Sequence, residues 1–270
     1  MTIEKPKILV PYDYTERSDY AIKYAVTLAK IIEGSIYLLH VVENITEEAE
    51  DTKRLNNVAE EVRQKYGVDI EIKIRPGNVQ KVIKAIAVTI NAFVVIMKSQ
   101  KQRGQRFVSS RTIRVMTGSK IPFIVIQEAP KRLAFRKVVF PIDFRKENKE
   151  KLVWISALSK YYTSKIYLLK PHANDYRVRN NVEFCKRFLE GKNIDYEIIT
   201  GKRSLSNVEE TLEFAHEIDA QLIIIMLSKR ISKLNILFGL KEQKYITNKY
   251  KIPIMCLNPK AELHRYEGFF

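Results

Sequence analysis

Two stretches of the chain join the end of an apolar segment to a dense run of basic side chains. In the first half, AFVVI (residues 92–96) is followed by MKSQKQRGQRFVSSRT (residues 97–112). A strand, a loop and a helix start in that order commonly hold a phosphate, because main-chain amides at a helix N-terminus point at the anion. This loop has a single glycine, Gly104, so lysine and arginine side chains would have to replace those amides.

Basic side chains fill the corresponding region of the second half as well. Residues 97–120 contain seven Lys and Arg and no acid, and residues 226–251 contain seven with one acid, Glu242. We expect five of these side chains, at the end of each apolar run and in the loop after it, to contact an anion. They are Lys98, Lys101, Arg103, Lys229 and Arg230. An acidic metabolite, a polyphosphate or a nucleic acid would suit them, and a solvated surface without a ligand is the alternative.

Other patterns that could carry chemistry fail on inspection. TGKRS (residues 200–204) resembles the end of a phosphate loop, but the preceding YEII lacks the first glycine and has a strand pattern. The four histidines show no metal-ligand spacing, and no serine, histidine and carboxylate arrangement is visible. We therefore expect no catalytic residue, no metal and no enzyme activity. The only cofactor left open is an adenine nucleotide or another anion.

Composition places the chain among globular proteins of a reducing compartment. Its 270 residues suffice for two domains, and 46% of them are hydrophobic. The net charge of +16 favours anionic ligands, although a lysine-rich proteome produces the same excess without a function. The two cysteines lie in apolar or helical stretches, and the sequence has no signal peptide and no apolar run of ~20 residues. We expect a cytoplasmic protein that does not enter a membrane.

An internal repeat decides the domain organisation. KILVPYDYTE and KVVFPIDFRK begin 130 residues apart, and so do SIYLLH and KIYLLK. The apolar runs that end at Met97 and Met226 are 129 apart, and KIPFIVI and KIPIMCL are 131 apart. Matches that hold one register along the chain indicate a duplication. We expect one domain over residues 1–129, a short linker, and a second domain over residues 137–260.

Each copy has a pattern of alternating strands and helices. In the first copy the strands are KILVPY, SIYLLHVV, VDIEIKI, AFVVIM and PFIVI. The first helix spans residues 18–32, with Ser18 as N-cap and Gly34 beyond its C-terminus. Strands separated by helices favour a parallel sheet covered on both faces. The predicted class is α/β, with two tandem, doubly wound, Rossmann-like five-stranded parallel sheets and helices on both faces.

The duplicated pattern resembles the universal stress protein family in its tandem two-domain form. The signatures are PYD and PID at the ends of the first strands, the segment SIYLLHVVE, and the closing KIPFIVI and KIPIMCL. The resemblance covers nearly the whole chain and implies an adenine nucleotide alpha hydrolase-like fold. It also implies a division, since some members bind ATP and others do not. In those that bind it, an aspartate at the positions of Asp13 and Asp143 helps to hold the nucleoside.

The phosphate-binding loop of the ATP-binding members is not matched. Their pattern after the fourth strand is G-x2-G-x9-G followed by Ser or Thr. Its three glycine positions hold Met97, Gln100 and Ser110 in the first copy and Met226, Lys229 and Gly239 in the second. Glycine permits positive φ and a close approach of main-chain amides to phosphate, whereas the larger side chains fill that space. We expect that ATP is not bound in the usual manner and that both aspartates cap the turn after the strand, a retained nucleoside contact being the alternative.

The leading hypothesis is a non-catalytic stress-response protein that binds a partner protein or a small anion. The alternatives are an adenine-nucleotide-binding protein with a rebuilt phosphate loop, and a basic protein that associates with nucleic acid. Specific nucleic-acid recognition is not expected, because no helix-turn-helix, zinc finger or RNA-binding aromatic motif is present.

The closing strand of each copy is apolar on both faces. The resemblance implies that such strands pair between subunits, and an apolar edge of this kind invites pairing. Because both copies are in one chain, we expect an internal pseudo-dimer about a pseudo-twofold axis. The residues that we expect at this interface are Phe123, Ile124, Val125, Ile126, Ile254, Met255, Cys256 and Leu257.

Overall fold

The computed structural model describes residues 5–43, 48–99, 110–129, 135–145, 148–172, 175–202, 207–227 and 241–259. We call residues 5–129 the first half and residues 135–259 the second half. The first half contains β1 (Lys7–Pro11), α1 (Glu16–Ile32), β2 (Ser35–Val42), α2 (Glu48–Tyr66), β3 (Ile70–Pro76), α3 (Val79–Thr89), β4 (Val94–Lys98), α4 (Ser110–Met116) and β5 (Phe123–Ile126).

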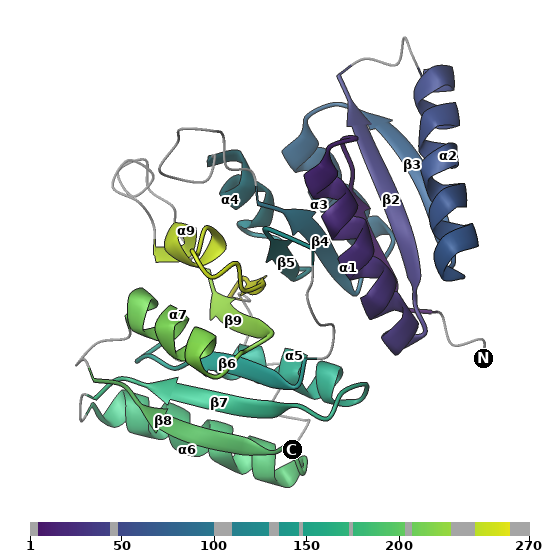
Figure 1. Ribbon diagram of the computed structural model, residues 1–270. Coiled ribbons are helices and arrows are strands. Elements are labelled where there is room, and N and C mark those ends of the chain that lie inside the picture. Colours follow the sequence, from purple (N-terminus) through teal and green to yellow (C-terminus); the bar gives the residue numbers. More distant parts are fainter. Residues whose placement is uncertain are drawn as a thin grey trace.

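The second half repeats this order of strands and helices (Figure 1). It contains β6 (Lys137–Pro141), α5 (Asn148–Ser159), β7 (Lys165–Lys170), α6 (Tyr176–Gly191), β8 (Tyr196–Thr200), α7 (Val208–Glu217), β9 (Leu222–Met226), α9 (Lys241–Ile246) and β10 (Ile254–Leu257). The predicted α/β class with helices on both faces is therefore confirmed.

The strands form one sheet rather than two. Their order is β3-β2-β1-β4-β5-β10-β9-β6-β7-β8, and each half is parallel and doubly wound as predicted. The two halves join where β5 and β10 pair antiparallel, with Ile124 opposite Met255. The closing strands thus pair as expected for an internal pseudo-dimer, and this pairing joins the two five-stranded sheets into one ten-stranded sheet. All residues of β5 and β10 are buried, so an unpaired edge there would leave main-chain amides without partners.

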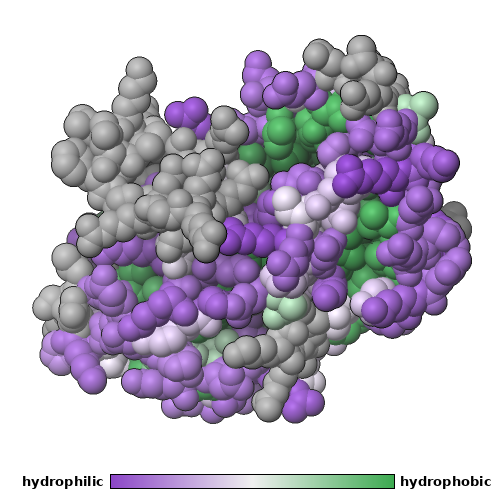
Figure 2. Space-filling view, turned by 45° about the horizontal axis from the view of Figure 1, so that its top comes forward, coloured by the Kyte–Doolittle hydropathy of each residue, from purple (hydrophilic) through white to green (hydrophobic). Residues whose placement is uncertain are grey.

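Side chains that alternate along the strands form two cores, one on each face of the sheet. One core contains Ile8 and Val10 with residues from α1, α2, α5 and α6. The other contains Leu9 with residues from α3, α4, α7 and α9. Hydrophilic side chains cover much of the outer face seen in Figure 2, as expected for helices that turn an apolar stripe inward.

Side-chain contacts outside the sheet strengthen the junction of the two halves. Trp154 of α5 packs edge-on against Phe93 of the first half, with ring centroids 5.6 Å apart. The Gln127 amide nitrogen donates to the Asn248 carbonyl over 3.0 Å, and the Asn258 amide nitrogen donates to the Met116 carbonyl over 2.7 Å. These two bonds occupy related places on either side of the β5–β10 pair.

The ends of α1 differ from the sequence prediction at both positions. The N-cap is Thr15, and Ser18 is buried in the first turn. At the other end Glu33, not Gly34, takes the left-handed conformation, with φ of 51°. Gly34 serves another purpose, because a Cβ there would collide with the carbonyl oxygen of Pro6.

Strand register also corrects the alignment of the two copies. Val94 lies beside Ile8 in the first half, and Leu222 lies beside Val138 in the second. Met226 therefore corresponds to Lys98, the last residue of β4, and not to Met97. The apolar pattern led to the wrong pairing because β4 continues one residue beyond its last apolar side chain.

Candidate functional site

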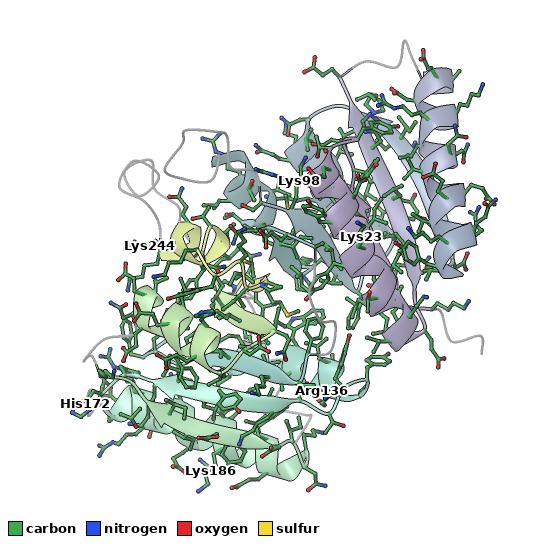
Figure 3. All side chains as sticks on the ribbon, in the orientation of Figure 1. Lys23, Lys98, Arg136, His172, Lys186 and Lys244 are labelled. Atoms are coloured by element: carbon green, nitrogen blue, oxygen red, sulfur yellow. The ribbon has the colours of Figure 1, made fainter. Side chains whose placement is uncertain are left out.

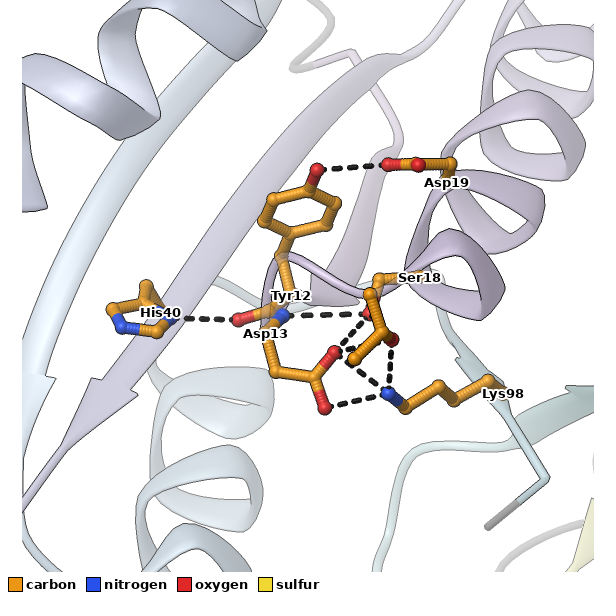
Figure 4. Close-up of polar contacts among 7 residues, drawn as sticks. Tyr12, Asp13, Ser18, Asp19, His40 and Lys98 are labelled. Carbon is orange, nitrogen blue, oxygen red and sulfur yellow. Dashed lines mark hydrogen bonds and ion pairs between the residues drawn. The ribbon is translucent and has the colours of Figure 1, made fainter. Parts of the chain in front are cut away.

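The crevice in which such sheets bind ligands lies at the carboxyl ends of β1 and β4. The chain leaves β1 toward α1 on one face and leaves β4 toward α4 on the other, so the connections diverge there. Asp13 follows β1, and Lys98 ends β4. Lys98 is labelled in Figure 3, and the close-up in Figure 4 shows Asp13 beside it, so two separate ligand candidates of the sequence analysis are in contact.

Asp13 and Lys98 form an ion pair across this crevice. The Lys98 ammonium donates to both Asp13 carboxylate oxygens, over 2.6 Å and 2.5 Å. Thr15 donates to the same carboxylate over 2.7 Å, and Ser18 makes a short hydrogen bond to it (Figure 4). The Lys98 side chain is 13% exposed. The carboxylate thus caps the turn after β1 and binds a cation from its own chain.

The hydrogen bonds to Asp13 favour its ionised form. Burial by itself would raise the pKa of the Asp13 carboxyl, but the bonds from Lys98, Ser18 and Thr15 outweigh burial and hold that pKa below its usual value. With a lowered pKa, the Asp13 carboxylate is a weak base and accepts a proton poorly at neutral pH.

Aromatic side chains surround the turn that carries Asp13. Tyr14 has a positive φ of 58°, and its ring lies 5.2 Å from Tyr12 and 4.8 Å from His40. The Arg54 guanidinium of α2 lies 4.0 Å from the Tyr14 ring centroid. His40 Nδ1 lies 2.8 Å from the Tyr12 carbonyl oxygen, so this half-buried histidine is hydrogen-bonded to the main chain beside the same turn. These contacts hold the turn in its left-handed conformation.

The second crevice holds its aspartate in a different way. The position of Lys98 is taken by Met226, so no lysine reaches Asp143 from the fourth strand of this half. Instead Arg145 donates to the Asp143 carboxylate through its Nε over 2.7 Å and its main-chain N–H over 2.9 Å. Asn181 of α6 donates to the Asp143 and Arg145 carbonyls and fixes this turn.

A buried lysine lies beneath the turn that carries Asp143. Lys151 of α5 is 1% exposed, and its ammonium donates to the Pro141 carbonyl over 2.6 Å and lies 4.1 Å from the Phe140 ring centroid. Burial lowers the pKa of Lys151 to about 7, and the nearby Asp143 charge acts in the opposite direction. The sequence contained a signal for it, since Lys151 shares a helical face with Ile155 and Leu158.

The remaining ligand candidates of the sequence analysis are Lys101, Arg103, Lys229 and Arg230, and they lie outside the described residues. Sequence reasoning missed Thr15, Arg145 and Lys151 as partners of the strand-end turns. Among the described residues, no group of three or more His, Cys, Asp or Glu could hold a metal, and no helix is long and apolar enough to cross a bilayer.

A family model assigns the first half. Residues 6–127 match the model of the universal stress protein family, and this range includes β1 to β5 and the Asp13–Lys98 crevice. The first domain of the chain is therefore a universal stress protein domain. Among curated proteins, no relative matches the chain significantly in sequence.

The chain shares its fold, along nearly its whole length, with solved structures of similar length. A universal stress protein from Archaeoglobus fulgidus is 18% identical and superposes with a TM-score of 0.74, covering 94% of this chain and 98% of its own. A putative universal stress protein from Pseudomonas aeruginosa is 14% identical with a TM-score of 0.67, covering 94% of each chain. The tandem two-domain form is therefore the arrangement of both halves.

Replacing Lys98 by methionine tests how Asp13 is held. We expect the pKa of the Asp13 carboxyl to rise, because its main cationic donor is lost, and stability at neutral pH to fall by about 1 kcal/mol. The lowered pKa in the wild type stabilises the fold above the unfolded value of 3.8, and this contribution is lost as the pH falls through the folded pKa. Carbon-13 NMR of the aspartate carboxyls measures this titration.

The matched control is Lys23→Met, which removes an exposed lysine from α1. It should leave the Asp13 titration where it is in the wild type. An unchanged titration in Lys98→Met as well would show that the ion pair does not hold the carboxylate in solution.

Proposed function

We propose that this universal stress protein is non-catalytic and acts in a cytoplasmic stress response by binding a partner protein or a small anion. It does so through two domains, residues 1–129 and residues 137–260. Its crevices do not bind ATP in the family's usual manner. The single observation that carries this proposal is the ion pair between Asp13 and Lys98, which bridges the first crevice.

The ion pair between Asp13 and Lys98 opposes the binding of a nucleoside in the first crevice. A ligand hydroxyl that reached Asp13 would have to displace the Lys98 ammonium and the Thr15 hydroxyl. The displaced ammonium is largely buried, so it would lose its counter-charge without gaining full hydration. A neutral hydroxyl does not compensate for that loss, because hydrogen bonds to charged groups are stronger than neutral ones.

The second crevice supports the same conclusion by different contacts. Asp143 is held by Arg145, so a ligand hydroxyl that reached this carboxylate would have to displace the Arg145 guanidinium. Each copy thus pairs its aspartate with a cation of its own chain, which supports the loss of the nucleoside contact in both. The weak basicity of Asp13 also supports a non-catalytic function.

Thermal unfolding with and without MgATP tests the proposal. Bound ATP would stabilise the fold by about 2.7 kcal/mol at a concentration of about 100 times Kd, which corresponds to a shift of several degrees. We expect no such shift in the wild type, and the same response in Asp13→Asn. The control Asp69→Asn removes an exposed aspartate from the same domain. A large ATP-induced shift that disappears in Asp13→Asn alone would refute the proposal and restore the nucleotide-binding alternative.

A further inference from the structure

Two aromatic side chains protrude beside the second crevice. Phe144 follows Asp143 and is 48% exposed, and Tyr176 begins α6 and is 63% exposed. Phe144 follows β6 and Tyr176 follows β7, and these two strands are parallel neighbours that end at the same edge of the sheet. Tyr176 is the most exposed large hydrophobic side chain among the described residues.

Arg177 joins the two rings into one surface. Its guanidinium lies 5.0 Å from the Phe144 ring centroid and 6.0 Å from that of Tyr176. The same guanidinium is held by Asp175, with Nη2 and Oδ2 2.6 Å apart. Because the arginine is already fixed in place, little side-chain entropy is lost when something packs on it. We call Phe144, Tyr176 and Arg177 the Arg177 patch.

The equivalent aromatic in the first half is not available in this way. Tyr14 corresponds to Phe144, but its hydroxyl donates to the Asp51 carbonyl over 3.2 Å and its ring is covered by Arg54 at 4.0 Å. It also packs against Tyr12 and His40. The first half uses its aromatic to hold its own turn, whereas the second half presents its aromatic to solvent.

The charges around the patch describe its partner. Two aspartates lie at its centre, Asp143 paired with Arg145 and Asp175 paired with Arg177, so the centre is close to neutral. Arg179 is exposed one helical turn beyond Tyr176 on α6, where residues three apart are neighbours, so it adds a positive charge beside Tyr176. A neutral aromatic and arginine centre is typical of protein interfaces, whereas a phosphate backbone is bound mainly by cationic side chains, and both arginines at this centre are paired with aspartates.

We propose that the Arg177 patch is a docking surface for an acidic protein segment that carries an apolar anchor residue. The anchor packs against the rings of Phe144 and Tyr176, and carboxylates of the segment face Arg179 at the rim. A second copy of this chain is disfavoured because each copy has a net charge of +16, which opposes self-association and favours an acidic partner. The inference rests on the proposed function in one respect, that the protein acts through a partner.

Fluorescence anisotropy of the full chain with a labelled peptide tests the surface. The probe is a fluorescein-labelled peptide with a Leu-Phe pair flanked on both sides by glutamates. We expect saturable binding that weakens roughly tenfold or more in the double variant Phe144→Ala, Tyr176→Ala. The matched control is Tyr161→Ala, which removes a tyrosine that is 38% exposed elsewhere and should leave binding unchanged. All substituted side chains are exposed, so circular dichroism should confirm an intact fold.

Three outcomes would overturn the docking surface. The first is that the wild type and the double variant bind the peptide equally, or that neither binds it. The second is that the wild type binds labelled oligothymidylate but not the peptide, and that this binding depends on Phe144 and Tyr176. The third is that the wild type self-associates in sedimentation and that the double variant does not. None of them bears on the ATP test, so the docking surface and the loss of nucleotide binding can fail separately.

Discussion

Lys151→Met should stabilise the protein at neutral and acidic pH, and the gain should shrink as the pH rises. The Lys151 ammonium is buried among apolar side chains, with the Pro141 carbonyl as its hydrogen-bond acceptor. Burial lowers its pKa from 10.5 to about 7, so the charged form destabilises the folded state. A difference of this size corresponds to roughly 3–5 kcal/mol, and the lost hydrogen bond to Pro141 takes back about 1 kcal/mol.

The sign of the pH dependence follows from proton binding. Between about pH 7 and pH 10.5 the unfolded chain holds a proton on Lys151 that the folded chain has released. Wild-type stability therefore rises with pH in this window, and below it both states are protonated, so the advantage of Lys151→Met is constant and largest there. Urea unfolding of both proteins across this range measures the difference.

Lys53→Met is the matched control, because Lys53 is an exposed lysine in the middle of α2. Its stability difference from the wild type should stay within about 0.5 kcal/mol at every pH. A constant difference between Lys151→Met and the wild type across the same window would show that Lys151 does not titrate as a buried amine.

Ile124→Asp should unfold the junction between the two halves. Ile124 is buried in β5 opposite Met255 of β10, and the structure offers no cation there to pair with a carboxylate among the residues facing it. An unpaired charge at this position costs about 4 kcal/mol or more, because it must be desolvated or the β5–β10 pairing must open. We expect the pairing to open, since it joins two halves that each have a core on both faces.

The single tryptophan of the chain reports on this event directly. Trp154 packs against Phe93 across the junction, so separation of the halves should expose its indole and shift its emission to longer wavelength. Val88→Asp places the same charge on an exposed site of α3 and should cost less than about 1 kcal/mol without changing the emission. Wild-type stability and emission in Ile124→Asp would mean that the sheet does not continue through β5 and β10.

The basic loops illustrate why side-chain roles are harder to predict than strands. Lys98 belongs to a run of basic residues, which made it look like a ligand for an external anion. In the fold Lys98 is the last residue of β4, and its ammonium donates to the carboxylate of Asp13, which lies 85 positions away in the chain. Sequence spacing cannot express that contact, because only the parallel arrangement of β1 and β4 brings the two strand ends together.

The sequence by itself determined the duplication, the alternation of strands and helices, and the parallel, doubly wound arrangement of each half. Local patterns carry that information, since strand and helix periods, together with the handedness of the connections, leave few arrangements open. Only the tertiary structure decided the register in which β5 and β10 pair, that Met226 stands where Lys98 would be, and that each aspartate is paired with its own cation. Those features depend on register and on contacts between distant segments, which packing sets and composition does not.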